Sequence, residues 1–251
     1  MATVMPATGI RRASAKRCRT DPAMGDAIRW QPSPNFGPRR DGLTPELIVI
    51  HYTAMSSAEA ALARLCDPAA EVSAHYLIAG DGRVWQMVEE MQRAWHAGAG
   101  RWGGQGDVNS RSVGIELDND GTYPFSDPQM RALEGLLAGI MDRWRIGPAG
   151  LIGHSDMAPD RKFDPGPRFD WVRLARQGLA VWPGQDACGE GDFIADAARF
   201  GYDPEYGADA VLAAFRARFR PFATGPLCAA DTAAMQDLAH RFGVDRIGNS
   251  A

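Results

Sequence analysis

The sequence has few cysteines and no long hydrophobic run, and both absences limit what the protein can be. Only four of its 251 residues are cysteine, and none belongs to a C-x-x-C pair or to another spacing typical of metal sites. No apolar stretch approaches the ~20 residues that a membrane-spanning helix needs. Glycine and proline are spread along the chain without a period, which excludes collagen-like and low-complexity proteins. The length suits a globular protein with one large domain or two smaller ones.

Acidic residues outnumber basic ones beyond the first 40 residues. That segment carries eight Lys and Arg against two Asp, whereas the rest of the chain is net acidic. Five basic residues lie close together in it: Arg11, Arg12, Lys16, Arg17 and Arg19. Nucleic-acid-binding domains need a basic surface, so the acidic body argues against a nucleic-acid partner. We expect residues 1–29 to form a disordered head, with Met24 as an alternative start to Met1.

The basic head has none of the features of an export signal. No apolar segment follows the Arg11-Arg12 pair, and the residues before Cys18 do not form a lipoprotein cleavage site. We therefore expect a cytoplasmic location, with a periplasmic one as the alternative. In the cytoplasm we expect reduced thiols rather than a Cys188–Cys228 disulfide. We also expect a monomer.

Strand and helix patterns alternate between residues 30 and 187 and predict an α/β domain. Apolar or β-branched runs predict strands at 47–52, 75–79, 83–88, 112–117 and 151–154. Capping boxes predict two helices, one opening at Ser56 with Glu59 and a longer one at Ser126 with Gln129. The glycine-rich residues 97–106 predict a loop. Together these elements indicate a mixed central β-sheet flanked by helices.

The pattern changes near residue 188. Segments 192–200, 208–219 and 231–242 predict three short helices separated by Gly/Pro turns. We expect residues 30–187 to form the catalytic domain and residues 188–251 a small three-helix domain.

Three residues at predicted strand ends or in adjacent loops have the chemistry of a metal site: His51, His154 and Asp164. Two imidazoles and a carboxylate with one open position are a usual donor set for catalytic zinc. The gap between residues 51 and 154 is too long for the sequence to show that they converge. Each residue also has a structural alternative, as a hydrogen-bonded core histidine or a turn-capping aspartate.

Seven segments in the same order resemble the type 2 N-acetylmuramoyl-L-alanine amidases over residues 30–183. They are 33–36, 49–54, 72–78, 94–98, 112–116, 152–156 and 161–167. These zinc amidases of bacterial peptidoglycan recycling share a fold with phage T7 lysozyme and the peptidoglycan recognition proteins. The resemblance implies hydrolysis of the amide between N-acetylmuramic acid, or its 1,6-anhydro form, and L-alanine of the stem peptide.

The resemblance also implies a role for five residues. His51, His154 and Asp164 would hold Zn²⁺. Glu116 would be the general base for a metal-activated water, and Lys162 would stabilise the oxyanion. Zinc lowers the pKa of a bound water towards about 7, so a nearby carboxylate can take its proton. A salt bridge is the alternative explanation for a carboxylate in the apolar strand around Glu116.

Further residues near these motifs are candidates for substrate binding. We predict that His96, Asn109 and Arg161 line the substrate groove, the arginine because a guanidinium can bind a peptide carboxylate through two hydrogen bonds. His75 matches no ligand position and is predicted to be a core histidine.

Residues 192–245 resemble the small peptidoglycan-binding domain that often accompanies these amidases. The resemblance is carried by 200–202, 213–219 and 231–232. Two alternatives to the amidase remain at this point: a muropeptide-binding protein without activity, and a zinc hydrolase of the same fold that cleaves another amide. The sequence also leaves open whether the substrate is intact wall or a recycled fragment.

Overall fold

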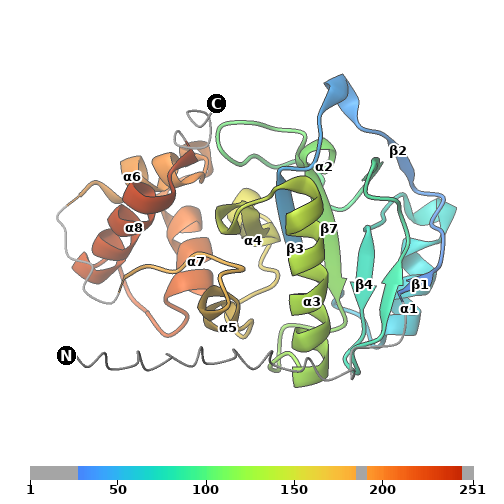
Figure 1. Cartoon of the computed structure of the whole chain (residues 1–251). Helices are drawn as coiled ribbons and strands as arrows, with labels where there is room; N and C mark the ends of the chain where they lie inside the picture. Colours follow the sequence, from blue (N-terminus) through green and yellow to red (C-terminus); the bar gives the residue numbers. More distant parts are fainter. Residues whose placement is uncertain (1–27, 185–190, 245–251) are drawn as a thin grey trace, which may run out of the picture.

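The computed structural model describes residues 28–184 and 191–244 (Figure 1). Its centre is a six-stranded sheet in the order β1-β5-β4-β7-β3-β8. The strands are β1 (Arg29–Trp30), β3 (Leu47–Tyr52), β4 (Tyr76–Ile78), β5 (Val84–Gln86), β7 (Ser112–Leu117) and β8 (Leu151–Gly153). A separate antiparallel pair joins β2 (Phe36–Pro38) to β6 (Gln92–Ala94).

The sheet is mixed, as the sequence predicts. β3 pairs in parallel with both β7 and β8, and β7 pairs in parallel with β4. β4 and β5 form the predicted antiparallel hairpin around residues 80–82. The carboxyl ends of four parallel strands therefore lie at one edge of the sheet, where ligands commonly bind in α/β folds.

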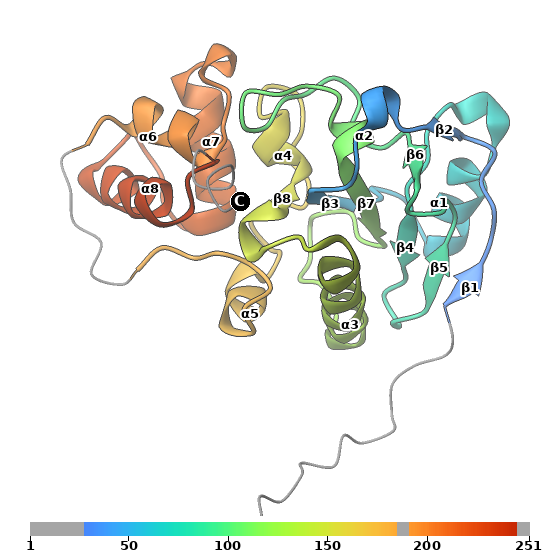
Figure 2. The same ribbon diagram turned by 45° about the horizontal axis from the view of Figure 1, so that its top comes forward.

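The longest helix, α3 (Asp127–Trp144), covers one face of the sheet together with α5 (Trp171–Arg176), as Figure 2 shows. Its start is the predicted one, because Ser126 accepts a hydrogen bond from the Gln129 N–H. Ile48 and Ile50 of β3 point to this face and pack in one core with α3. Because side chains alternate along a strand, His51 points to the opposite face.

The opposite face of β3 packs against α4 (His154–Met157) and the C-terminal helices. These are α6 (Phe193–Phe200), α7 (Ala208–Phe219) and α8 (Ala229–Phe242), at the positions predicted for three helices. One core joins Val49 of β3 and Met157 of α4 to Phe215 of α7. The three helices and the sheet thus share a hydrophobic core. The predicted boundary near residue 188 lies outside the described residues, and independent folding of the two parts stays a prediction.

The helix α1 (Ala58–Leu65) packs on the far end of the sheet against β4 and β5. Its N-cap is Ser57, whose side chain accepts from the Ala60 N–H at 3.2 Å, so the predicted capping box at Ser56 was one residue early. Only Ser56 has a Glu three residues later, but it is Ser57 that has the extended backbone of an N-cap and a side chain that reaches the third helical N–H.

Several short elements have no counterpart among the predictions. They are β1, β2, β6, α2 (Val108–Arg111), α4, α5 and the 3₁₀ turns Arg40–Gly42, Pro68–Ala70, Pro148–Gly150 and Pro204–Tyr206. The strand predicted for 151–154 ends at Gly153, and His154 instead begins α4. No helix in the described ranges is long and apolar enough to cross a membrane. Cys66 and Cys228 are free thiols, and Cys18 and Cys188 lie outside the described residues.

Candidate active site

Adjacent parallel strands bring together residues that are far apart in the sequence. His51 near the end of β3 lies directly opposite Glu116 on β7. β8 pairs with the other side of β3, and His154 follows it as the first residue of α4. Asp164 lies in the loop after α4. The fold therefore joins residues 51, 116, 154 and 164 at one edge of the sheet.

The three predicted metal ligands converge in the structure. Nδ1 of His51 lies 2.9 Å from Nδ1 of His154, and each of these atoms lies 3.0 Å from Oδ2 of Asp164. All three residues are buried. Tetrahedral zinc with ligand distances of about 2.0–2.1 Å would place neighbouring donor atoms about 3.3 Å apart, close to the separations seen here.

Two of these three atoms can serve as metal donors. Nε2 of His154 lies 3.1 Å from the Ala97 carbonyl, which can only accept, so Nε2 carries a proton, and the neutral form of the ring that binds metals has a bare Nδ1. Burial raises the pKa of the Asp164 carboxyl, but contacts with His154 and His51 lower it further, so the net shift is downward. A bare nitrogen and a carboxylate oxygen 3.0 Å apart favour a cation between them. The donor set therefore fits a metal ion.

The environment of His51 favours its neutral imidazole form over the imidazolium cation. Burial, followed by the nearby His154, lowers the pKa of His51 to about 4. The ring is consequently neutral at physiological pH, which is the form that binds metals.

Glu116 points to the same face of the sheet as His51, because the two residues are in register on neighbouring strands. Its Oε2 is buried and has no hydrogen-bond partner within the described parts of the chain. Burial, followed by the charge of Asp164, raises the pKa of Glu116 to about 8, although the charge of Lys162 opposes this shift. An unpaired buried carboxyl with a raised pKa is typical of a proton-transferring group. The alternative explanation, a salt bridge, is not supported, because no residue in the described structure forms an ion pair with Glu116.

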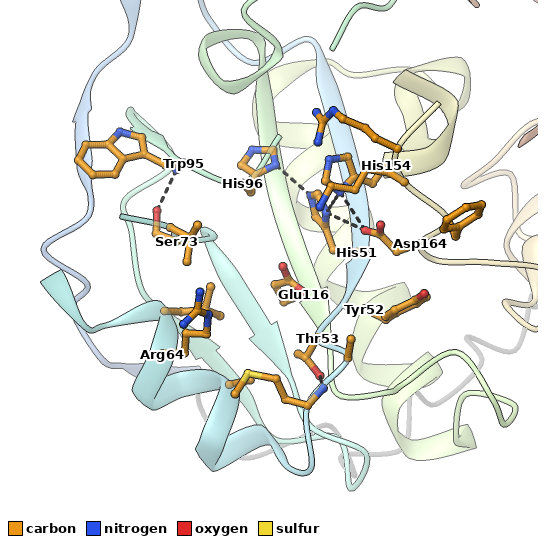
Figure 3. A pocket seen from close by; sticks show the side chains of 18 residues that line it. His51, Tyr52, Thr53, Arg64, Ser73, Trp95, His96, Glu116, His154 and Asp164 are labelled. Carbon is orange, nitrogen blue, oxygen red and sulfur yellow. Dashed lines mark hydrogen bonds and ion pairs between the residues drawn. The ribbon is translucent and has the colours of Figure 1, made fainter. Parts of the chain in front are cut away.

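A pocket with a cavity volume of about 350 Å³ contains these residues (Figure 3). Its wall includes all three ligand candidates, Glu116 and Lys162. In the view of Figure 3, Glu116 lies between the ligand cluster and Arg64 of α1. Lys162 is partly exposed and makes no ion pair in the described structure. The pocket thus holds a carboxyl and an ammonium group beside the candidate metal site.

The three predicted substrate-binding residues occupy different positions. His96 and Arg161 line the pocket, and Nη2 of Arg161 donates to the carbonyls of Ala97, at 2.8 Å, and Ala99. Asn109 is buried, and its Oδ1 accepts from the backbone N–H groups of His96 and Ala97. These contacts favour a supporting role for Asn109, and the substrate-binding roles of all three residues stay predictions.

His75 is fully buried, as expected for a core histidine. Its Nδ1 accepts from the Gly114 N–H at 2.9 Å, and its Nε2 lies 3.1 Å from the Gln92 carbonyl. Burial, followed by the charge of Arg39, lowers the pKa of His75 to about 3.

Among the further residues of the pocket wall, sequence reasoning did not identify Tyr52, Arg64 and Phe163. Tyr52 and Phe163 are direct sequence neighbours of predicted site residues, and this was the only signal available for them. Arg64 had none, because an exposed arginine on an amphipathic helix looks like an ordinary surface residue.

The comparison with known proteins agrees with this geometry. A family profile described as N-acetylmuramoyl-L-alanine amidase matches residues 41–167. The Escherichia coli N-acetylmuramoyl-L-alanine amidase AmiD is 35% identical over 237 residues, covering 80% of this chain and 84% of the relative. The 1,6-anhydro-N-acetylmuramyl-L-alanine amidase AmpD of E. coli is 37% identical over 163 residues, covering 58% of this chain and 89% of the relative.

Solved structures show the same relationship. The complex of E. coli AmiD with anhydro-N-acetylmuramic acid-L-Ala-D-γ-Glu-L-Lys has a TM-score of 0.73 and 33% identity, and covers 85% of this chain and 93% of that one. AmpDh3 of Pseudomonas aeruginosa in complex with anhydromuramic pentapeptide has a TM-score of 0.71 and 28% identity, and covers 88% and 100%. The fold, the residues of the site and these matches agree, and the chain belongs to the N-acetylmuramoyl-L-alanine amidase family.

Proposed function

We propose that this chain cleaves the amide between the lactyl group of 1,6-anhydro-N-acetylmuramic acid and L-alanine, releasing the stem peptide. The observation that carries the proposal is the placement of Glu116 in one pocket with the cluster of His51, His154 and Asp164. Two similar amidases are named or crystallised with anhydro-muramyl peptides, which supports this substrate class over intact wall.

We propose Zn²⁺ as the metal, held by His51, His154 and Asp164. Two imidazoles and a carboxylate suit zinc and leave one coordination position for water or substrate. Bound there, zinc would polarise the lactyl carbonyl and lower the pKa of water towards about 7. His154→Ala should abolish stoichiometric zinc binding, and a variant that keeps full zinc content would contradict this ligand set.

Glu116 is the proposed general base. Its carboxylate takes the proton of the attacking water and returns it to the leaving amine of L-alanine. The charge of a bound metal ion would favour the ionised form, opposing the burial that raises the pKa of Glu116. General base catalysis of this kind typically contributes about 10²–10⁴ in rate.

Lys162 is the proposed oxyanion partner. Its ammonium group lines the same pocket as Glu116 and lies near enough to lower the pKa of that carboxyl. A fixed positive charge stabilises the negative charge that develops on the carbonyl oxygen during attack, and therefore acts mainly on the transition state.

The negative charge of the stem peptide complements the basic residues of the pocket. Arg64 and Arg161 both line it, and Arg64 makes no ion pair in the described residues. The stem peptide carries free carboxylates, which guanidinium groups bind well. We propose that these arginines face the peptide rather than the sugar.

Other aspects of the function stay predictions. They are the cytoplasmic location, the monomeric state and glycan binding by residues 188–251. Cell fractionation, sedimentation and pull-down on purified wall test them in turn.

The test of the function is hydrolysis of purified anhydro-muramyl-tripeptide, followed by detection of free tripeptide and loss of release on adding a chelator. Acetyl-L-alanine peptides without the sugar are the control for general amide hydrolysis. Release from the control at the same rate would contradict the muramyl specificity. Zinc binding without release from either substrate would favour a muropeptide-binding protein.

A further inference from the structure

A chain of hydrogen bonds connects the ring of His51 to a backbone carbonyl. Nε2 of His51 lies 3.0 Å from Nδ1 of His96, and Nε2 of His96 lies 3.2 Å from Oγ of Ser112. The Ser112 hydroxyl lies 2.6 Å from the Val108 carbonyl. The proposed reaction uses neither His96 nor Ser112.

The Val108 carbonyl sets the direction of every bond in this chain, because a carbonyl oxygen only accepts. Ser112 donates its one hydroxyl proton to Val108, so its oxygen accepts from the Nε2–H of His96. A neutral imidazole has a single N–H, which leaves Nδ1 of His96 bare to accept from Nε2 of His51. The proton of His51 is then on Nε2, and the free electron pair is on Nδ1, beside Asp164.

We propose that His96 is a positioning residue that holds His51 in the tautomer whose bare Nδ1 faces the metal site. The proposal rests on the metal centre of the proposed function and adds a residue that does not itself contact the metal. Partners that fix the tautomer and orientation of a histidine ligand typically contribute about 10–100-fold to metal affinity.

The surroundings of His96 fit this role. A Cβ at position 114 would lie 2.4 Å from Cγ of His96, so the absence of a side chain at Gly114 makes room for the ring. Asn109 Oδ1 holds the backbone by accepting from the N–H groups of His96, at 3.0 Å, and Ala97, at 2.8 Å. The Ala97 carbonyl fixes the tautomer of His154. Residues 96–97 therefore set the proton positions of both histidine ligands.

Two substitutions separate positioning from simple packing. His96→Phe keeps an aromatic ring but removes the acceptor, whereas His96→Asn places an amide oxygen near the position of Nδ1. In a Zn²⁺ titration of the metal-free protein, we expect the Kd to rise about 10–100-fold in His96→Phe. We expect His96→Asn to recover most of this loss.

His75→Asn is the matched control. His75 is a buried imidazole whose ring centroid lies 5.8 Å from that of His96. It hydrogen-bonds with Gly114 and Gln92 and takes no part in the hydrogen bonds that link His51 to the Val108 carbonyl. Its replacement should leave the Kd for Zn²⁺ near the wild-type value. An equal loss of zinc affinity in His75→Asn and His96→Phe would show a general packing effect and would overturn the proposal.

The second readout is the proton position itself, measured by long-range ¹H–¹⁵N NMR of the zinc-loaded protein. We expect the His51 proton on Nε2, with a hydrogen-bonded shift that His96→Phe removes, and a bare Nδ1 on His96. A protonated Nδ1 on His96, or wild-type zinc affinity in His96→Phe, overturns the proposal.

Ser112→Ala provides a variant that leaves the imidazole in place. It removes the acceptor that fixes the proton of His96, so we expect the hydrogen-bonded signal of His51 to weaken and the Kd for Zn²⁺ to rise. If the His51 signal and the Kd for Zn²⁺ are unchanged in Ser112→Ala, the proposed role of these hydrogen bonds is contradicted, even if His96→Phe fails to fold. Neither readout uses turnover, so failure of the proposed amidase reaction would be recognised separately.

Discussion

Arg218 of α7 forms an ion pair with Asp156 of α4, two residues after the ligand candidate His154. Nη1 of Arg218 lies 2.6 Å from Oδ2 of Asp156, and their side chains are 2% and 1% exposed. The other carboxylate oxygen accepts from the Tyr202 hydroxyl at 2.6 Å. The C-terminal helices thus hold the short helix that carries part of the metal site. This contact gives them a structural role whether or not they bind glycan.

Removal of Arg218 should therefore destabilise the protein strongly. Arg218→Ala leaves the Asp156 carboxylate buried without its cation, and breaking such a pair costs about 3–5 kcal/mol. Urea denaturation of the zinc-free protein measures this change. Arg131→Ala is the control, because the Arg131–Asp127 pair is exposed and worth at most about 1 kcal/mol. Similar losses in the two variants would contradict a supporting role for Arg218.

Glu116→Gln should separate catalysis from metal binding. The amide keeps the size of the side chain but cannot take a proton from water, so we expect kcat to fall about 10²–10⁴-fold. Zinc content, measured on the same sample, should stay at the wild-type value because Glu116 is not a ligand candidate. Near-normal turnover in this variant would reject the general base assignment.

Lys162→Ala should lower kcat with a smaller effect on KM. Loss of one oxyanion partner typically costs about 10²–10³ in rate, because the interaction forms mainly in the transition state. Lys162→Arg keeps the charge and is expected to retain more activity. If Lys162→Ala instead raises KM alone, the lysine binds substrate and does not stabilise the oxyanion.

The raised pKa of Glu116 predicts a pH-dependent stability in the metal-free protein. Its pKa is about 8 in the folded chain against an ordinary value of 4.5. Between these two values the folded state binds more protons, so Glu116 makes the free energy of unfolding fall as pH rises. Glu116→Gln has no such titration. Its stability relative to wild type should therefore increase from pH 5 to pH 8.5, by a few kcal/mol in order of magnitude.

Unfolding in urea with chelator, at both pH values, measures this difference. A constant difference between the two proteins would show that Glu116 does not titrate in this range.

Elements with a periodic apolar pattern or a capping residue were predictable from the sequence. The strand at 112–117 and the helix cap at Ser126 agree with the structure, because apolar pattern and cap chemistry are both local. Short elements such as α2 and α4 were missed because helices of four residues have too few positions to show a period. Tertiary contacts, rather than propensity, hold them in place.

In the candidate site too, the residue types could be read from the sequence, whereas their tertiary contacts could not. The residue types of His51, His154 and Asp164 indicated a metal centre, and the family resemblance supplied Glu116 and Lys162. Their convergence depends on strand order, which places β3 between β7 and β8 and cannot be read from spacing. The hydrogen bond between His51 and His96 could not be read from the sequence either, because His96 reaches the site from the loop after β6, a strand outside the six-stranded sheet.

The most direct test of this account is the zinc content of the purified protein together with peptide release from anhydro-muramyl-tripeptide. We predict about one zinc per chain, held by His51, His154 and Asp164. We also predict release of free tripeptide that stops on chelation and returns when Zn²⁺ is added back. A protein that binds no zinc after reconstitution, or that releases peptide equally well without metal, would contradict the account.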